Sequence, residues 1–399
     1  MHKVVDWFKN LDNPKKVALI SFFSSLYFYL PILTIYYQRR GLDFVQINFL
    51  WGIITATIFL AEVPTGIIAD KIGRRSSIII ALILQLFGEI FFLFGQSYFH
   101  FVLISVIAGV GFAFQSGCIQ ALVYDSLKSQ KMEGLMKKVQ GNINAFYQGG
   151  HLFGALSSSF LITQITASRI SLAIILTIIS VGISLIISLF LKEPVVQYEH
   201  SEKNPLGIFI KSLKLIRGNP NLKRIILLGL FATPFAGYLR NFHPPYFELA
   251  NIPPFWLGIS LTAGGVLAML ASKYAYRFEK IFGVEKGMLI ATLIPAILYI
   301  LMSLIISPVL AILLFTLNYG SMSLQDPLIA DYYNIHIPSN VRATALSTIN
   351  MFSSIYIAVI GLLIGWIANS SVLYAFAFMG IVVLLGAVIF RINETHTTA

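Results

Sequence analysis

Residues 66–75 read Gly-Ile-Ile-Ala-Asp-Lys-Ile-Gly-Arg-Arg and join two apolar runs, at 44–69 and 76–95. Each run is long enough to cross a membrane as a helix, which takes about 20 residues. So short a polar connection requires a tight turn, and Gly73 has the backbone freedom to form one. The stretch therefore predicts two antiparallel membrane helices that are joined at one membrane surface.

The whole chain has the composition of a protein with many membrane crossings. Its 399 residues are 57% hydrophobic and only 11% charged, with a mean hydropathy of +0.80. Soluble proteins carry about 25% charged residues, so soluble enzymes and nucleic-acid-binding domains are excluded. The single cysteine, Cys118, lies in an apolar run and cannot build a disulfide framework or a metal site. We expect no metal and no cofactor.

Apolar runs bounded by charged or turn residues predict twelve crossings in two sets of six. The first six-helix bundle takes residues 1–191, a cytoplasmic linker takes 192–222, and the second bundle takes 223–399. Within the linker, the apolar residues of 206–216 fall on one helical face, which favours a helix on the membrane surface. The expected crossings are 17–38, 44–69, 76–95, 99–124, 140–164, 169–191, 223–247, 255–276, 287–306, 308–331, 342–367 and 371–391.

The distribution of charge predicts the orientation. Cytoplasmic loops of membrane proteins carry an excess of Lys and Arg. With the N-terminus inside, 24 of the 28 Lys and Arg residues are cytoplasmic, and the outer side holds only Arg39, Arg40, Arg169 and Arg240. This asymmetry supports twelve crossings with both termini in the cytoplasm. It predicts a multi-pass protein of the cytoplasmic (inner) membrane.

The two sets of six are related by a faint internal repeat. A shift of 206 residues gives two matches without a gap, Asp125 on Asp331 and residues 143–146 on 349–352. Separately, residues 70–73 resemble residues 279–283 with one inserted residue. Together the matches favour two homologous halves, the arrangement in which secondary transporters hold their substrate near the membrane midplane.

The connection at 66–75 resembles the loop motif of the major facilitator superfamily. The family pattern is Gly, three residues, Asp, two residues, Gly, Arg, then Arg or Lys, and its fixed positions are present as Gly66, Asp70, Gly73, Arg74 and Arg75. The resemblance implies an all-α membrane protein with 12 transmembrane helices in two pseudo-symmetric six-helix bundles. It also implies a monomer. Gly66 is expected to let a neighbouring helix approach closely.

The resemblance further implies a role for the motif. Asp70, Gly73 and Arg74 would help to latch the two halves together on the cytoplasmic side and release them during alternating access. Asp125, which ends the fourth crossing, is placed to pair with Arg74 or Arg75. The plainer alternative is that these charges only set the topology.

Other features depart from the drug/proton antiporter branch of this superfamily. Gly109 and Gly111 occupy the expected places in the fourth crossing, but Ser105 stands where that branch has an Arg. In the fifth crossing His151 follows Gly150, where that branch has a Gly-Pro step. The similarity is therefore to bacterial drug and metabolite transporters in general.

Few ionisable residues lie within the crossings. Placing one in the hydrocarbon costs roughly 2.5–3.5 kcal/mol, so each is a candidate for function. Glu62 lies two turns before Asp70, Glu89 near the middle of the third crossing, and His151 in the fifth crossing. Each can carry a coupling proton. The alternatives are a permanently paired carboxyl, favoured for Glu89 because the third helix is peripheral in this superfamily, and an interhelical hydrogen bond for His151.

In this superfamily helices 1, 4, 7 and 10 line the central cavity, so their polar residues are expected to face the substrate in part. Arg240 either attracts an anionic group or pairs with Glu248, and pairing is the preferred interpretation. The candidates are Tyr27, Tyr29, Gln115, Arg240, Asn241, Asn318, Gln325 and Asp326.

These features predict a secondary transporter and not an enzyme. The expected partners are a small-molecule substrate, protons as coupling ion and the lipid bilayer, with no nucleic acid. Proton-coupled efflux of lipophilic compounds is favoured slightly because the cavity has few charges, and uptake or exchange of a metabolite is the alternative. A polytopic membrane enzyme would need clustered His, Asp or Cys, whereas the seven histidines are scattered. The sequence also lacks the phosphate-binding loop of a primary pump.

Overall fold

The chain folds into two compact helical units. The computed structural model describes residues 11–194, 218, 220–232, 235–338 and 342–390, and these contain helices and no strands. Of these described residues, 11–42 and 50–194 belong to unit 1, and 43–49 and those from 218 onward belong to unit 2. The surface helix expected at 206–216 lies outside the described residues.

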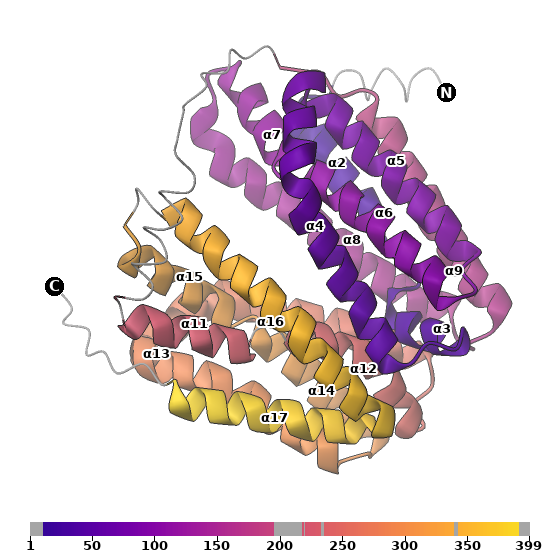
Figure 1. Ribbon diagram of the computed structural model, residues 1–399, viewed down its shortest axis with the longest axis vertical. Coiled ribbons are helices and arrows are strands. Elements are labelled where there is room, and N and C mark those ends of the chain that lie inside the picture. Colours follow the sequence, from indigo (N-terminus) through magenta and orange to yellow (C-terminus); the bar gives the residue numbers. More distant parts are fainter. Residues whose placement is uncertain (1–10, 195–217, 219, 233–234, 339–341, 391–399) are drawn as a thin grey trace. The chain divides into compact units, whose positions relative to one another are not determined.

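Unit 1 begins with a helix whose start is fixed by local chemistry. The side chain of Asp12 accepts a hydrogen bond from the backbone N–H of Lys15 at 3.0 Å, and Pro14 fits the first turn. Farther along, α5 packs against both α6 and α9 (Figure 1). The elements are α2 (Asn13–Ser24), η1 (Leu30–Ile32), α3 (Leu33–Arg39), α4 (Phe44–Ile72), α5 (Arg74–Leu93), α6 (Tyr98–Gln115), α7 (Cys118–Lys128), η2 (Glu133–Leu135), α8 (Met136–Leu161) and α9 (Ala167–Ser188).

Unit 2 contains the helices from Pro220 onward together with the first turns of α4. Its long α13 packs against α14 and α17 (Figure 1). The elements are α11 (Pro220–Ala232), α12 (Phe235–Leu249), α13 (Phe255–Leu304), α14 (Pro308–Met322), α15 (Gln325–His336), α16 (Arg342–Ser370) and α17 (Val372–Ile389).

Each unit has its own apolar core. In unit 1, Ile78 and Leu82 of α5 pack with Leu122 of α7, and all three are fully buried. In unit 2, Ile225 of α11 packs with Tyr332 of α15 in the corresponding cluster. Because lipid is as apolar as these side chains, close packing and hydrogen bonds hold such helices together more than removal from water does.

The turn expected at Gly73 is present, and unit 2 has a matching one. Gly73 has φ 92° and ψ 158°, and Gly283 has φ 73° and ψ 166°. Both pairs of angles lie in a region that is essentially restricted to glycine. Gly283 interrupts α13 and divides it into two helical parts. The resemblance between residues 70–73 and 279–283 is therefore also a resemblance of backbone conformation.

The 206-residue repeat also relates two interrupted helices. α6 gives way to α7 around Gly117, which has φ 73°, and α14 gives way to α15 around Ser323. These two positions are 206 residues apart. Discontinuous helices are common in secondary transporters, and these two interruptions occupy matching positions in the two units.

Most of the expected crossings correspond to long apolar helices. Of the described residues, nine helical segments are long and apolar enough to cross a membrane, and the one at 255–304 covers two expected crossings that meet near Gly283. The expected crossings 17–38 and 140–164 are not among them. The first is interrupted between α2 and α3, and α8 carries a polar first half. The count of twelve therefore stays a prediction.

Candidate functional site

The first helix of unit 1 is interrupted between Ser24, which ends α2, and Leu30, which begins η1. A continuous helix would need a hydrogen bond from residue 31 to the carbonyl of Tyr27, but Pro31 has no N–H to donate. An interruption within a membrane leaves backbone groups that must find other partners.

Side chains of two neighbouring helices supply those partners. On α9, the hydroxyl of Ser180 donates to the carbonyl of Phe23 at 2.7 Å. The hydroxyl of Thr177 accepts from the backbone N–H of Phe28 at 3.1 Å. On α5, the amide of Gln85 donates to the last carbonyl of α2 at 2.9 Å. These three side chains hold the interruption in a defined shape.

Two glycines of α8 let the interrupted segment lie directly against that helix. A Cβ at Gly150 would collide with the hydroxyl of Ser25, and one at Gly154 would stand 3.1 Å from the backbone nitrogen of Tyr27. Ser25 also donates to the carbonyl of Tyr147 at 2.8 Å. Small residues four apart are a common device for close helix packing in membranes. Both glycines belong to the fifth expected crossing, in which the drug/proton antiporter branch has a Gly-Pro step and this sequence has none.

A buried carboxylate lies next to the interruption. The Oε2 atom of Glu89, on α5, accepts a hydrogen bond from the hydroxyl of Tyr29 at 2.8 Å, and the two side chains are only 8% and 6% exposed. One turn earlier on α5, Gln85 donates to the hydroxyl of Tyr27 at 2.9 Å. Two residues of α5 thus hold two tyrosines of the interrupted helix.

The ring of His151 completes this arrangement from α8. It stacks on Tyr27 with ring centres 5.9 Å apart and an interplanar angle of 14°. Tyr147 meets the same imidazole edge-on at 4.7 Å. We name the set the helix-1 cluster, and its members are Tyr27, Tyr29, Gln85, Glu89, Tyr147 and His151.

The helix-1 cluster unites four of the residues that the sequence singles out, Tyr27, Tyr29, Glu89 and His151. Gln85 and Tyr147 are members that the sequence does not reveal, since neither lies in a helix expected to line the cavity. Glu62 lies apart from the cluster, exposed on α4.

In unit 2 a hydrogen bond connects the two helices that correspond to α5 and the interrupted first helix, namely the second part of α13 and α12. Tyr299 lies sixteen residues after Gly283, as Glu89 lies sixteen after Gly73. Phe235, the first residue of α12, corresponds to Tyr29 under the 206-residue shift. The hydroxyl of Tyr299 donates to the carbonyl of Phe235 at 2.9 Å, and Tyr299 is fully buried.

Three of the polar residues expected in the cavity are buried in hydrogen bonds or close contacts of unit 2. Gln325 donates its amide to the carbonyl of Ala291 at 2.9 Å, and the Asn318 amide lies 3.7 Å from the sulfur of Met302. Asn241 donates to the side-chain oxygen of Asn48 at 3.3 Å. These contacts fix the three side chains within unit 2, and their role toward a substrate stays a prediction.

The partner of Asn241 belongs to the first turns of α4, which group with unit 2. There Asn48 donates to the carbonyl of Gly361 at 2.9 Å, and the backbone N–H of Phe44 donates to the side chain of Asn369 at 2.8 Å. Gln115, at the end of α6, and Arg240 are half-buried, and Asp326 is exposed.

The loop motif forms a compact polar cluster at the end of α4. The guanidinium of Arg74 lies 3.1 Å from the carboxylate of Asp125, both being largely buried. The guanidinium of Arg75 donates to the carbonyl of Leu189 at 2.9 Å. The structure thus pairs Asp125 with Arg74, one of the two partners considered from the sequence.

Glu193 is a further member of the motif cluster that sequence reasoning did not single out. Its carboxylate accepts hydrogen bonds from the backbone N–H groups of Arg74, at 2.8 Å, and Arg75, at 2.7 Å. A carboxylate at a helix N-terminus is stabilised by the helix dipole as well as by these bonds. The signal available in the sequence is an acidic residue two positions after the sixth apolar run.

Two motif residues lie outside these contacts. Asp70, in the last turn of α4, is exposed. At Gly66 a Cβ would meet no atom of the described residues within 4 Å. The close helix approach expected at Gly66 stays a prediction.

Known proteins share this architecture. Residues 17–361 match the sequence profile of the Major Facilitator Superfamily. The chain is 22% identical over 325 residues to a protein of Bacillus subtilis (strain 168), the uncharacterized MFS-type transporter YxaM, with 79% of each chain covered.

Solved transporters have the same fold. The nucleoside transporter NupG superimposes with a TM-score of 0.77 at 14% identity, covering 96% of this chain and 100% of that one. A bacterial homolog of the human lysosomal transporter Spinster superimposes with a TM-score of 0.73 at 15% identity, covering 95% of both chains. A POT family transporter superimposes with a TM-score of 0.71 at 13% identity, covering 94% of both chains.

Proposed function

Because the chain belongs to the Major Facilitator Superfamily, we propose that it is a proton-coupled transporter that moves a small solute across the cytoplasmic membrane by alternating access. Twelve crossings with both termini in the cytoplasm are part of this proposal, which the charge distribution supports. The protein acts as a monomer. The observation that carries the coupling is the buried Glu89 beside an interrupted helix.

Glu89 is the proposed site of the coupling proton. Its hydrogen bond to Tyr29 is a direct link from a titratable group to the interrupted part of the first helix. A carboxylate held away from water is costly in its charged form, so gain or loss of a proton there changes the free energy of the surrounding conformation. Glu62 and His151 are the weaker candidates, because Glu62 is exposed on α4 and His151 stacks on the ring of Tyr27, whereas Glu89 has a direct hydrogen bond to the interrupted segment.

The solute is proposed to bind beside the helix-1 cluster. The rings of Tyr27, His151 and Tyr147 offer flat apolar faces, and Tyr147 is 44% exposed. Few charges accompany these rings, which supports export of a lipophilic compound. The half-buried Gln115 and Arg240 and the exposed Asp326 stay candidates for further contacts.

Uptake or exchange of a metabolite is the second candidate. It is favoured by the fold neighbours, which include a nucleoside transporter and a POT family transporter crystallised with a peptide conjugate. The polar groups of Gln85 and Tyr27 can also recognise a hydrogen-bonding solute.

The cytoplasmic motif is proposed to act as the latch of the transport cycle. The pair of Arg74 with Asp125 and the two hydrogen bonds to Glu193 support a defined loop conformation. Asp70 is the exposed acidic group of the same loop. Its exposure leaves its carboxylate available to a second conformation of the protein.

Proton movement in inside-out membrane vesicles tests this proposal. A pH-sensitive dye reports release of protons from the acidified lumen when lipophilic cations or metabolites are added. For export by proton exchange, a subset of lipophilic cations triggers release that vesicles without the protein do not show. If neither the cations nor the metabolites move protons in vesicles that contain the protein, the proton-coupled function is wrong for these solute classes.

A further inference from the structure

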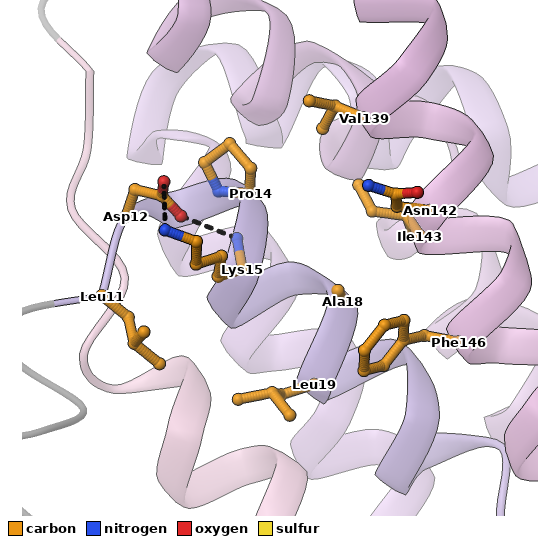
Figure 2. Close-up of a pocket in the computed structure, with 10 residues that line it drawn as sticks. All are labelled: Leu11, Asp12, Pro14, Lys15, Ala18, Leu19, Val139, Asn142, Ile143 and Phe146. Carbon is orange, nitrogen blue, oxygen red and sulfur yellow. Dashed lines mark hydrogen bonds and ion pairs between the residues drawn. The ribbon is translucent and has the colours of Figure 1, made fainter.

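A pocket of about 350 Å³ lies between α2 and α8 in unit 1. Figure 2 shows residues 11–19 on one side of the pocket and residues 139–146 of α8 on the other. Neither the helix-1 cluster nor the motif cluster contributes a lining residue. The pocket is therefore lined by residues other than those of the proposed transport site.

The walls of the pocket are apolar along most of its length. Leu19 on α2 and Ile143 and Phe146 on α8 contribute hydrocarbon surface, and Asn142 is the one uncharged polar side chain in the α8 wall. Phe146 is 43% exposed and meets Phe22 edge-on, with ring centres 6.4 Å apart. Such a lining suits a hydrocarbon chain better than a polar solute.

Charged residues gather at the end of the pocket where both helices begin. Lys15 lies 3.3 Å from Asp12, and its side chain is 68% exposed. On α8, Lys138 is exposed and lies one helical turn before Asn142, so it is on the face that lines the pocket. Lys137 adds a third exposed cation next to it. Two acidic residues accompany these three cations, Asp12 and, in η2 directly before α8, the exposed Glu133, so this end is net positive by one charge.

The distance between the two ends fits one leaflet of a membrane. Lys138 and Phe146 are eight residues apart on α8, which is about 12 Å along a helix. Half the hydrocarbon core of a bilayer is about 15 Å thick. The charged end thus lies at headgroup level when the apolar end reaches into the acyl chains.

We propose that this pocket binds an anionic phospholipid of the leaflet in which α2 and α8 begin, with its headgroup at Lys15 and Lys138 and an acyl chain along Leu19 and Phe146. The proposal depends on the apolar lining and the net charge of the rim, and it does not depend on the coupling ion or the solute. The proposed function enters in one respect only: with the N-terminus in the cytoplasm, the leaflet that supplies the lipid is the cytoplasmic one.

A tryptophan reporter and brominated lipids test the site. The full-length protein with Phe146→Trp is reconstituted into vesicles that contain equal fractions of a phosphatidylglycerol or a phosphatidylcholine with brominated acyl chains, and quenching is measured against the protein without the substitution. The control reporter is Phe153→Trp, two turns farther along α8, exposed and outside the pocket lining. Both changes replace one aromatic ring by another.

We expect stronger quenching of the reporter at position 146 by the anionic lipid and equal quenching by the two lipids at position 153. In the Phe146→Trp background, Lys138→Gln lowers the preference for the anionic lipid about fivefold, the effect typical of one lysine near a charged membrane surface. Lys131→Gln, an exposed lysine outside the pocket, leaves it unchanged.

Equal quenching of position 146 by the two lipids would overturn the proposal. So would a preference for the anionic lipid that is equally strong at position 153, because it would show general attraction of the protein's basic surface. A preference that neither Lys138→Gln nor Lys15→Gln reduces would also refute the assigned headgroup site.

Discussion

In unit 1 a hydrogen bond between a phenol and a carboxylate connects α5 to the interrupted first helix. In unit 2 a hydrogen bond between a phenol and a backbone carbonyl connects α13 to α12 in the corresponding place. Glu89 meets Tyr29 at 2.8 Å, and Tyr299 meets the carbonyl of Phe235 at 2.9 Å. A neutral hydroxyl is therefore sufficient to connect these two helices. The fold therefore does not require an ionisable group at position 89, and this supports a functional reason for the carboxyl group of Glu89.

The loop turns of the two units make a second comparison. Gly73 and Gly283 have nearly the same backbone angles, but the surroundings differ. The carboxylate of Glu193 lies over Gly73, where a Cβ would stand 2.9 Å from its carbon atom, and the space beside Gly283 is open within 4 Å. The turn of unit 1 is thus fixed by a partner as well as by its backbone.

The largest expected effect is on gradient-driven transport, and it follows from the ionisable group that only the hydrogen bond of unit 1 contains. Glu89→Gln keeps an acceptor for Tyr29 but cannot bind and release a proton, so we expect gradient-driven transport to fall by roughly tenfold or more, equivalent to about 1.4 kcal/mol. Exchange of solute without a gradient should continue. Solute flux into proteoliposomes with and without an imposed pH gradient measures both quantities.

The matched controls for that variant are Glu62→Gln and Tyr299→Phe. Each is expected to retain gradient-driven transport, since Glu62 lies outside the helix-1 cluster and Tyr299 makes a neutral bond. If the pH gradient still drives transport normally in Glu89→Gln, the carboxyl group of unit 1 has no function that the neutral hydroxyl of unit 2 lacks.

The next effect is on thermal stability, which we expect to differ between substitutions in the two turns. Alanine at either glycine must adopt a backbone conformation that costs about 1–3 kcal/mol. Gly73→Ala must also displace the carboxylate of Glu193 and disturb its two hydrogen bonds, so we expect it to lower the unfolding temperature more than Gly283→Ala does. Thermal unfolding of the purified protein in detergent measures the difference.

Gly141→Ala serves as the reference for that pair. Gly141 is exposed within α8, and a Cβ there meets nothing within 4 Å. Alanine in a helix is favoured over glycine by about 0.5–1 kcal/mol, so no loss of stability is expected. Equal destabilisation by Gly73→Ala and Gly283→Ala would show that Glu193 does not distinguish the turns.

The smallest expected effect on transport comes from removing one hydroxyl in each unit. Tyr299→Phe loses a hydrogen bond to a neutral carbonyl, typically about 1 kcal/mol, while Tyr29→Phe loses one to an ionisable carboxyl, typically about 1.5–3 kcal/mol. We therefore expect both variants to be modestly less stable and only Tyr29→Phe to change the pH dependence of transport. A pH profile shifted equally by the two variants would contradict the account.

Much of the fold follows from simple sequence patterns, and the interruptions of the helices do not. Apolar run length places the long helices, and the glycine in the motif predicts the turn at 73. The interruption after Ser24 has only Pro31 as a local signal. Its shape is fixed by partners on α5 and α9, such as Gln85 and Ser180, that are distant in sequence. Local patterns do not contain those pairings.

The candidate site was predictable to the extent that rare residues mark it. A carboxyl and a histidine inside apolar runs identify Glu89 and His151, and the structure shows both at the helix-1 cluster. Glu62 carried the same signal, yet it lies exposed on α4, because burial depends on which face of a helix meets its neighbours. Glu193 escaped notice since its role depends on contact with a loop more than a hundred residues earlier.

Infrared difference spectroscopy of the purified protein tests the central claim most directly, because it needs no knowledge of the solute. Titration between acidic and alkaline buffer reveals the carbonyl stretch of each carboxyl group that gains or loses a proton. We predict a band from a buried carboxylic acid in the wild type and in Glu62→Gln that is absent from Glu89→Gln. The same band persisting in Glu89→Gln would show that Glu89 does not exchange the proton, and would contradict its assignment as the coupling site.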